Sequence, residues 1–212
     1  MRFIRKYGNL LIWCLFYLAF AYSMNDVAVS LGIDFQWFLE DNLFTVAKYF
    51  FDVSILFTSY LYVVKKPFHS VLFMARCKEF YLWYIILYGL KICLFYVGYT
   101  AILFIGFPFL SGIPLEYDGS LLFAFVNLFA FVFSIYLVYV IILLLSGKQM
   151  VGLLSSVAIN FNMAMVYQVF LRTDNETLLR GMEHFIMNFY IGIAIVLLGV
   201  IFIIFRRRDF LL

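Results

Sequence analysis

Three ionisable residues, Lys48, Asp52 and Lys91, lie inside long apolar stretches of this sequence. A charge at the centre of a membrane helix costs at least about 2.5–3.5 kcal/mol on insertion scales, so such residues usually pair with a partner or serve a function. Lys48 and Asp52 are four residues apart, which places them on one face of a helix and within reach of each other. Lys48 also lies about 8 Å from the expected outer end of its helix, near enough for its side chain to reach the interface.

Asp52 and Lys91 lie deeper in their apolar stretches. At about 1.5 Å of rise per residue, counted from opposite ends, both residues reach the middle of a bilayer. Three interpretations remain open: an Asp52–Lys91 bridge between neighbouring helices, a polar point on the path of a transported molecule, or simple snorkelling to the interface. We take the bridge as the first expectation, because a lone buried charge would be left uncompensated.

Motifs for catalysis or nucleotide binding are missing. The sequence contains no Walker A motif, no Gly-x-Ser-x-Gly elbow and no helical His/Glu metal motif. Its two histidines, His69 and His184, fall in a basic loop and at a helix end, where we expect them to be solvated. Cys14, Cys77 and Cys93 have the spacing of neither a metal site nor an external disulfide. We therefore expect no enzyme activity, no catalytic residue, no metal and no cofactor in this chain.

The composition is that of a membrane protein. Of the 212 residues, 67% are hydrophobic and 13% are charged, and the mean hydropathy is +1.04. Soluble domains are about half apolar and a quarter charged, and a membrane-spanning helix needs about 20 mostly apolar residues. Six apolar segments meet that length, at residues 9–25, 43–64, 80–107, 120–146, 150–171 and 185–205. We predict an all-α polytopic membrane protein with six transmembrane helices in a single domain, residues 1–212.

Local signals indicate where some of these helices end. Asn25 and Asp26 interrupt the first apolar run early. Pro108 should end the third, because proline disfavours helix at the residue before it. The sequence 146–149, Ser-Gly-Lys-Gln, predicts a tight turn between the fourth and fifth helices.

The distribution of basic residues indicates the orientation, since Lys and Arg accumulate in cytoplasmic loops. Eleven of the 15 basic residues fall on one side of the six segments: Arg2, Arg5, Lys6, Lys65, Lys66, Arg76, Lys78, Lys148, Arg206, Arg207 and Arg208. The opposite side has only Arg172 and Arg180. We predict that both termini are cytoplasmic and that the loops near 26–42, 108–119 and 172–184 are external. We also predict that the protein is a multi-pass protein of a cell membrane, namely the bacterial cytoplasmic membrane.

Two further segments are expected to lie along the membrane. Residues 1–10 alternate basic and apolar residues at helical spacing, which predicts an amphipathic interfacial helix. The cytoplasmic loop 65–79 has an apolar centre, residues 71–74, between pairs of basic residues. That loop is either a short helix at the headgroups or a docking element for a cytoplasmic partner.

Four local features occur together along the chain: the basic N-terminal segment, the basic-then-aromatic stretch 74–83, Ser-Gly-Lys at 146–148, and the short basic tail with Asp209 at 205–210. This combination resembles the membrane subunits of ABC-type exporters, in the permease family that exports antibiotics, bacteriocins and polysaccharides. The chain departs from larger members in its short N-terminal elbow and its small 172–184 connection.

The resemblance implies a coupling helix at residues 67–78, seated in a groove of a separate ABC ATPase. The implied coupling residues are Phe68, Val71, Leu72, Phe73, Met74, Arg76 and Lys78. The implied partners are that ATPase, a second copy or a sister permease, and the lipid bilayer, with no nucleic acid.

The expected function is therefore export of an amphipathic molecule, such as a peptide or a lipid-linked compound, driven by ATP hydrolysis in a partner subunit. Two alternatives stay open. One is the six-helix substrate-binding membrane subunit of a vitamin-type importer. The other is a non-transporting membrane protein, such as an immunity or assembly factor.

Overall fold

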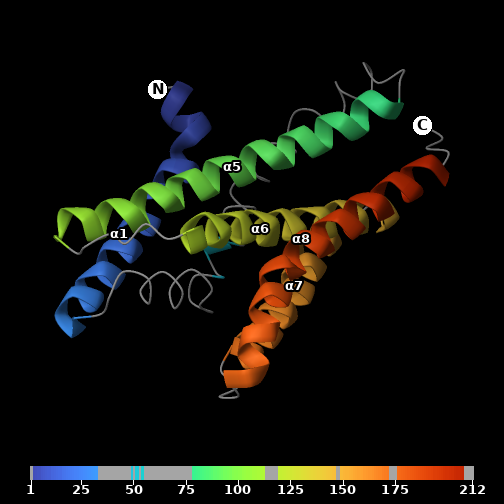
Figure 1. The fold of residues 1–212 in the computed structure, drawn as a ribbon. Helices are drawn as coiled ribbons and strands as arrows, with labels where there is room; N and C mark the ends of the chain where they lie inside the picture. Colours follow the sequence, from blue (N-terminus) through green and yellow to red (C-terminus); the bar gives the residue numbers. More distant parts are fainter. Residues whose placement is uncertain are drawn as a thin grey trace. The chain divides into compact units, whose positions relative to one another are not determined.

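The computed structural model describes residues 2–32, 49, 51–52, 54, 78–112, 119–146, 149–171 and 176–207 (Figure 1). The elements in this part of the chain are five α-helices: α1 (Arg2–Leu31), α5 (Lys78–Leu110), α6 (Gly119–Ser146), α7 (Gln149–Leu171) and α8 (Glu176–Arg207). The all-α class predicted from composition is confirmed for these residues.

Three of these helices are long and apolar enough to cross a bilayer, through the stretches Gly8–Leu31, Leu82–Leu110 and Ala124–Ser146. Helices α7 and α8 contain shorter apolar stretches, Met150–Ile159 and Phe189–Ile204. The total of six spans and the cytoplasmic position of both termini remain predictions.

The chain divides into two compact units, residues 1–125 and 126–212, and the division falls inside α6. Because one helix crosses the division, the single-domain expectation also remains a prediction. The two units are described one at a time.

In the first unit, α1 and α5 run parallel. The α1 residues Trp13, Tyr17 and Asn25 meet α5 near Tyr96, Thr100 and Ser111 respectively, so the partner on α5 advances as α1 advances. Two parallel helices require the connecting chain to return along their length.

Residues 49–54 show this return directly. Ser54 contacts Trp13 near the start of α1, whereas Phe51 contacts Tyr17 and Phe20 further along. The order of contacts is reversed, so this segment runs antiparallel to α1. The three segments alternate in direction, as the first three predicted spans require.

The first helix is longer than its apolar run suggests. It is continuous from Arg2, with no break after the expected interfacial segment 1–10, and it passes through Asn25 and Asp26 to Leu31. Asn25 fits because its buried amide donates a hydrogen bond to Ser111 Oγ (2.8 Å), while Asp26 stays exposed. The helix ends at Gly32, whose φ of 64° is the left-handed conformation that glycine supplies at helix ends. The expected end at residue 25 is wrong.

Pro108 does not end α5 either. It lies inside the helix, which continues to Leu110. The missing N–H of Pro108 removes one backbone hydrogen bond, and because Pro108 lies in the last turn, only two residues of the helix follow it. The turn closes with Ser111 N donating to Phe107 O at 3.0 Å.

In the second unit, the middle of α6 is buried on every side, because residues 131–138 are all buried in succession, whereas Leu145 near its end is exposed. This agrees with its uniformly apolar sequence, since a helix that is hydrophobic all round is an interior helix. The helix ends on both sides of the predicted turn are confirmed, because α6 ends at Ser146 and α7 begins at Gln149. The two residues between them lie outside the described part of the chain.

Helices α6 and α7 pack antiparallel and very close. Ser156 Oγ on α7 donates to the Ile135 carbonyl on α6 at 2.6 Å. A Cβ added at Gly152 would lie 3.2 Å from the Tyr139 carbonyl oxygen and 3.3 Å from the Leu143 amide nitrogen. Small residues at the interface of membrane helices permit such an approach of the backbones.

Candidate functional site

Among the described residues of the first unit, one carboxylate, that of Asp52, lies in the interior. Its side chain is only 2% exposed, and its Oδ1 accepts a hydrogen bond from the Tyr96 hydroxyl. Tyr96 is fully buried and is the central residue of the 29-residue apolar stretch Leu82–Leu110. The carboxylate therefore lies at the middle depth of α5, where a polar group is expensive unless it is hydrogen-bonded.

Hydroxyl groups from α1 and α5 surround this contact. The hydroxyl oxygens of Tyr17 and Thr100 are 3.0 Å apart, and those of Tyr17 and Tyr96 are 3.5 Å apart. Thr100 Oγ1 also donates to the Tyr96 carbonyl at 2.9 Å. A tyrosine hydroxyl has one proton to donate. When Tyr96 directs its proton to Asp52, its contact with Tyr17 is left as the longer and weaker one.

Two further hydrogen bonds join the same segments. The Trp13 indole N–H donates to Ser54 Oγ at 2.7 Å, and Ser54 Oγ in turn donates to the Phe51 carbonyl at 2.9 Å. On the other side of α1, the Tyr99 hydroxyl donates to the Cys14 carbonyl at 2.8 Å. Side chains of α1, residues 49–54 and α5 are thus joined by three separate sets of hydrogen bonds.

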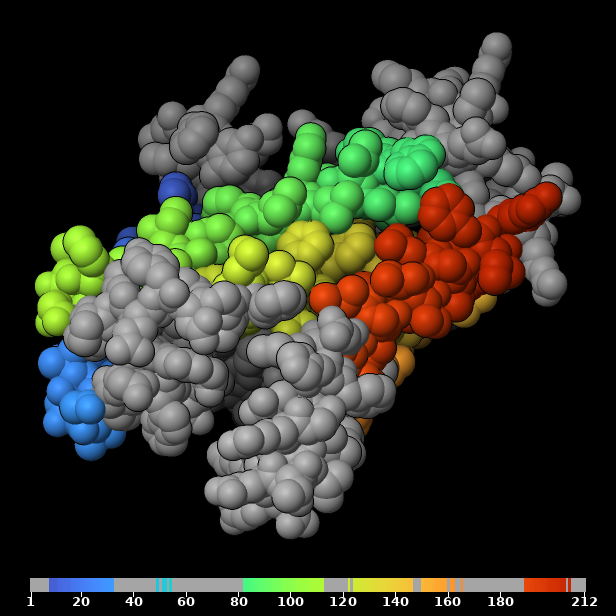
Figure 2. Space-filling model, in the orientation of Figure 1, coloured from blue at the N-terminus to red at the C-terminus, as the bar shows by residue number. Residues whose placement is uncertain are grey.

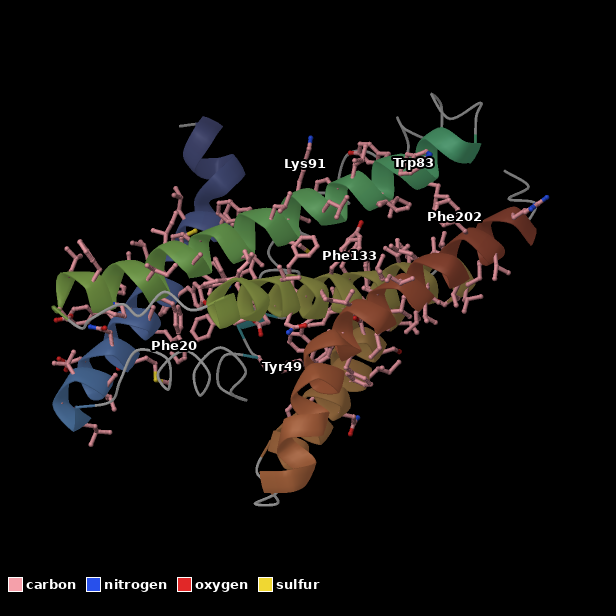
Figure 3. All side chains as sticks on the ribbon, viewed as in Figure 1. Phe20, Tyr49, Trp83, Lys91, Phe133 and Phe202 are labelled. Atoms are coloured by element: carbon pink, nitrogen blue, oxygen red, sulfur yellow. The ribbon has the colours of Figure 1, made fainter. Side chains whose placement is uncertain are left out.

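Aromatic rings enclose these hydrogen bonds. The Trp13 ring stacks on the Tyr17 ring at 5.1 Å between centroids, and Tyr17 also lies 5.1 Å from Phe51 and 5.8 Å from Tyr96. Further rings continue the layer, as Phe20 does against Phe51 at 4.6 Å (Phe20 is labelled in Figure 3). We use the name Asp52 cluster for Trp13, Tyr17, Asp52, Ser54, Tyr96 and Thr100.

Lys91 is not part of the Asp52 cluster. It precedes Tyr96 by five residues, which is about 140° around a helix. Its side chain is exposed and points outward from α5 in Figure 3; α5 is the green helix of the space-filling view in Figure 2. The expected Asp52–Lys91 bridge is therefore wrong: Asp52 is held by a tyrosine hydroxyl on the opposite side of α5.

The other predicted residues are placed only in part. Lys48 lies outside the described residues, and so do the expected coupling residues 68–76. Lys78, the last of the coupling set, is the first residue of α5. Within the described part of the chain, no group of three or more His, Cys, Asp or Glu residues is placed to hold a metal ion.

The sequence interpretation missed the uncharged members of the Asp52 cluster. A signal for them exists, because Trp13 and Tyr17 are four residues apart, and so are Tyr96 and Thr100. A spacing of four puts each pair on one helical face. Polar or amphipathic pairs on one face of an otherwise apolar segment mark the side that turns toward the protein interior.

Comparisons with known proteins do not assign this chain to a family. No protein-family model matches it, and no curated protein or solved structure matches it significantly.

Proposed function

We propose that this chain is the transmembrane subunit of an ATP-driven exporter in a bacterial cytoplasmic membrane. In this proposal the chain has six spans, pairs with a second copy or a sister permease, and moves an amphipathic molecule. A separate ATPase docks on residues 67–78. The observation that supports it best is the Asp52 cluster, a buried acid at the middle depth of a long apolar helix.

A purely stabilising role does not explain why an acidic residue is buried at this position. Replacing a buried ionic group by well-packed apolar residues is often neutral or stabilising. Acids within membrane segments that face the protein interior are more often on the path of a substrate or an ion. In the Asp52 cluster, three segments of alternating direction meet around the carboxylate, so a displacement of any one segment alters its surroundings.

The helix α5 offers a route from the proposed docking loop to the Asp52 cluster. It is continuous from Lys78, the end of that loop, to Leu110. Tyr96 lies about 27 Å along this helix from Lys78. A push on the loop during ATPase closure would move α5 as a rod and draw the Tyr96 hydroxyl away from Asp52.

The docking proposal is tested with the double variant Leu72→Ser, Phe73→Ser. These residues are the apolar centre of a basic loop, as expected of an anchor with a polar rim. We expect the variant to insert into the membrane normally, to lose the ATPase on purification and to lose stimulated ATP hydrolysis. Met150→Ser, which changes an exposed apolar residue at the start of α7, is the matched control and should retain the ATPase.

A double variant that keeps a full complement of ATPase with normal turnover would remove the docking assignment. The exporter proposal would then rest on the Asp52 cluster and the resemblance alone.

A further inference from the structure

We propose that the outward face of α5 at Lys91 binds the phosphate of an anionic phospholipid at one surface of the bilayer. This inference goes beyond transport, because it concerns the lipid as a partner. It is carried by the register of α1 against α5, by the exposure of the lysine, and by the charges that lie at the same depth.

The contacts between α1 and α5 keep one register along the pair. Three hydrogen bonds join residues 85, 83 and 86 positions apart: Cys14–Tyr99, Tyr17–Thr100 and Asn25–Ser111. Ring contacts scatter by no more than about one turn around these offsets, from Tyr17–Tyr96 to Tyr17–Phe104. Because both helices rise equally per residue, a residue of α5 is level with the α1 residue about 84 positions earlier.

This register places Lys91 level with Tyr7 of α1. Tyr7 directly follows the basic start of α1, residues 2–6, and directly precedes its apolar stretch, Gly8–Leu31. Basic residues next to a membrane helix lie among the headgroups, and the apolar stretch lies in the hydrocarbon. Lys91 is therefore at a surface of the bilayer, not at the central depth expected from the sequence. The Asp52 cluster is about 7.5 Å further in and remains within the hydrocarbon.

The lysine side chain is placed to reach the headgroups. It is exposed and extends away from α5 (Figure 3). Side chains of a helix lean toward its N-terminus, so the ammonium group leans toward the start of α5, which is the side of this bilayer surface. Its exposed neighbours on the same face of α5 are apolar: Leu87, Leu94, Phe95 and Ile102. Lys91 is thus a cation at the edge of a face that is suited to acyl chains.

The chemistry at this depth favours a lipid that carries a net negative charge. An ammonium group forms charge-assisted hydrogen bonds with phosphate oxygens. The basic residues 2–6 of α1 add attraction at nearly the same level, whereas the choline group of a zwitterionic lipid offsets its own phosphate. Trp83, 54% exposed, lies about 12 Å closer to the start of α5, where an indole suits the headgroup layer. An acidic residue of another membrane chain is not needed to compensate a lysine that reaches phosphate.

The depth of Lys91 is tested by cysteine labelling in a background in which Cys14, Cys77 and Cys93 are replaced by serine. Lys91→Cys is compared with Ile102→Cys, which lies on the same exposed face but level with the middle of Gly8–Leu31. A water-soluble maleimide is applied to open membrane sheets. We expect residue 91 to react about tenfold faster or more, because a thiolate does not form readily in hydrocarbon. Equally slow labelling at the two positions would overturn the proposal.

Lipid choice is tested by native mass spectrometry of the purified full-length chain. Phosphatidylglycerol and phosphatidylcholine with the same acyl chains are titrated separately. We expect Lys91→Leu to weaken binding of the first phosphatidylglycerol about fivefold, the contribution of one basic residue near an anionic surface, and to leave phosphatidylcholine binding unchanged. Lys91→Arg keeps the charge and should keep the preference.

Two results would contradict the lipid assignment. One is equal binding of the two lipids to the unaltered protein, which decides the matter without any variant. The other is a full preference for phosphatidylglycerol in Lys91→Leu. Either result would assign Lys91 to an acidic group of another membrane chain instead.

Discussion

The three segments around Asp52 and the α6–α7 pair are held together in different ways. Around Asp52, long side chains from α1, residues 49–54 and α5 meet at their tips through hydroxyl groups, an indole N–H and ring faces. Between α6 and α7, the backbones themselves approach, with Gly152 against Tyr139 and Leu143 and a serine hydroxyl on a carbonyl.

The difference has a mechanical consequence. A contact between side-chain tips can be broken and remade by rotamer changes or small shifts of a helix. A close contact between backbones leaves no such slack, because any added atom forces the helices apart. The backbones of α1 and α5 also lie close together, so the contrast concerns the contacts themselves. We infer that the hydroxyl contacts of the Asp52 cluster are adjustable and that the Gly152 contact of the α6–α7 pair is fixed. Substitutions in the two regions should therefore differ in their effect on the free energy of unfolding.

The largest effect is expected from Gly152→Leu in the fixed region. Its first added carbon would already lie 3.2–3.3 Å from backbone atoms of α6, and the rest of the side chain has no space to enter. We expect a loss of about 3 kcal/mol in the free energy of unfolding, at the upper end of the usual cost of overpacking. Gly199→Leu on α8 is the control, because a Cβ there meets nothing within 4 Å. Denaturation in mixed micelles measures both, and equal losses would refute the close-packed interface.

A smaller effect is expected from Tyr17→Phe in the adjustable region. It removes the hydroxyl that lies between Thr100 and Tyr96 but keeps the ring and its stacking. Polar contacts between membrane helices contribute about 0.6 kcal/mol on average and up to about 1.7, so we expect a loss of about 1 kcal/mol. Tyr22→Phe, at an exposed tyrosine of the same helix, should cost nothing measurable. A loss as large as that of Gly152→Leu would mean that the Asp52 cluster is not adjustable.

The smallest effect on unfolding is expected from Lys91→Leu. The residue is exposed on the far side of α5 from the Asp52 cluster, so its removal should change the free energy of unfolding by less than about 0.5 kcal/mol. Its effect should also add to that of Asp52→Asn, because residues without shared partners behave independently. A coupling energy above about 1 kcal/mol in the double-mutant cycle would restore the ion pair that the structure contradicts.

Sequence reasoning located the five described helices, because bilayer-length apolar runs are long and their composition is extreme; the predicted segment 43–64 lies mostly outside the described residues. It found the turn between α6 and α7 for a related reason: Gly147 and Lys148 are a sharp local interruption between two apolar runs. It missed the true ends of α1 and α5. Asn25 remains inside α1 because its amide donates a hydrogen bond to Ser111, 86 residues away, and Pro108 remains inside α5 because it lies in the last turn. Neither feature can be read from the local sequence.

The charge of Asp52 revealed the candidate site in the sequence, but the partner predicted for it, Lys91, was wrong. Asp52 stands out in an apolar run, and the search for a partner turned to the nearest available cation at the same depth, Lys91. A partner that the structure shows, Tyr96, is one of 16 tyrosines, and nothing in its own type distinguishes it from the others. Its helical face decides the matter, and that face depends on how α1 and residues 49–54 pack against α5.

Residues 49–54 run antiparallel to α1 and α5 and place the Asp52 carboxylate against the Tyr96 hydroxyl. This arrangement is the basis of the proposed site. Paired cysteines test this most directly, in a background in which Cys14, Cys77 and Cys93 are replaced by serine. Trp13→Cys with Ser54→Cys should cross-link with a short bifunctional thiol reagent in native membranes, since the two side chains are in contact. Leu15→Cys with Ser54→Cys should not, because Leu15 is 66% exposed on another face of α1 at nearly the same depth. Efficient linkage of the 15–54 pair, or none of the 13–54 pair, would contradict the arrangement on which the site depends.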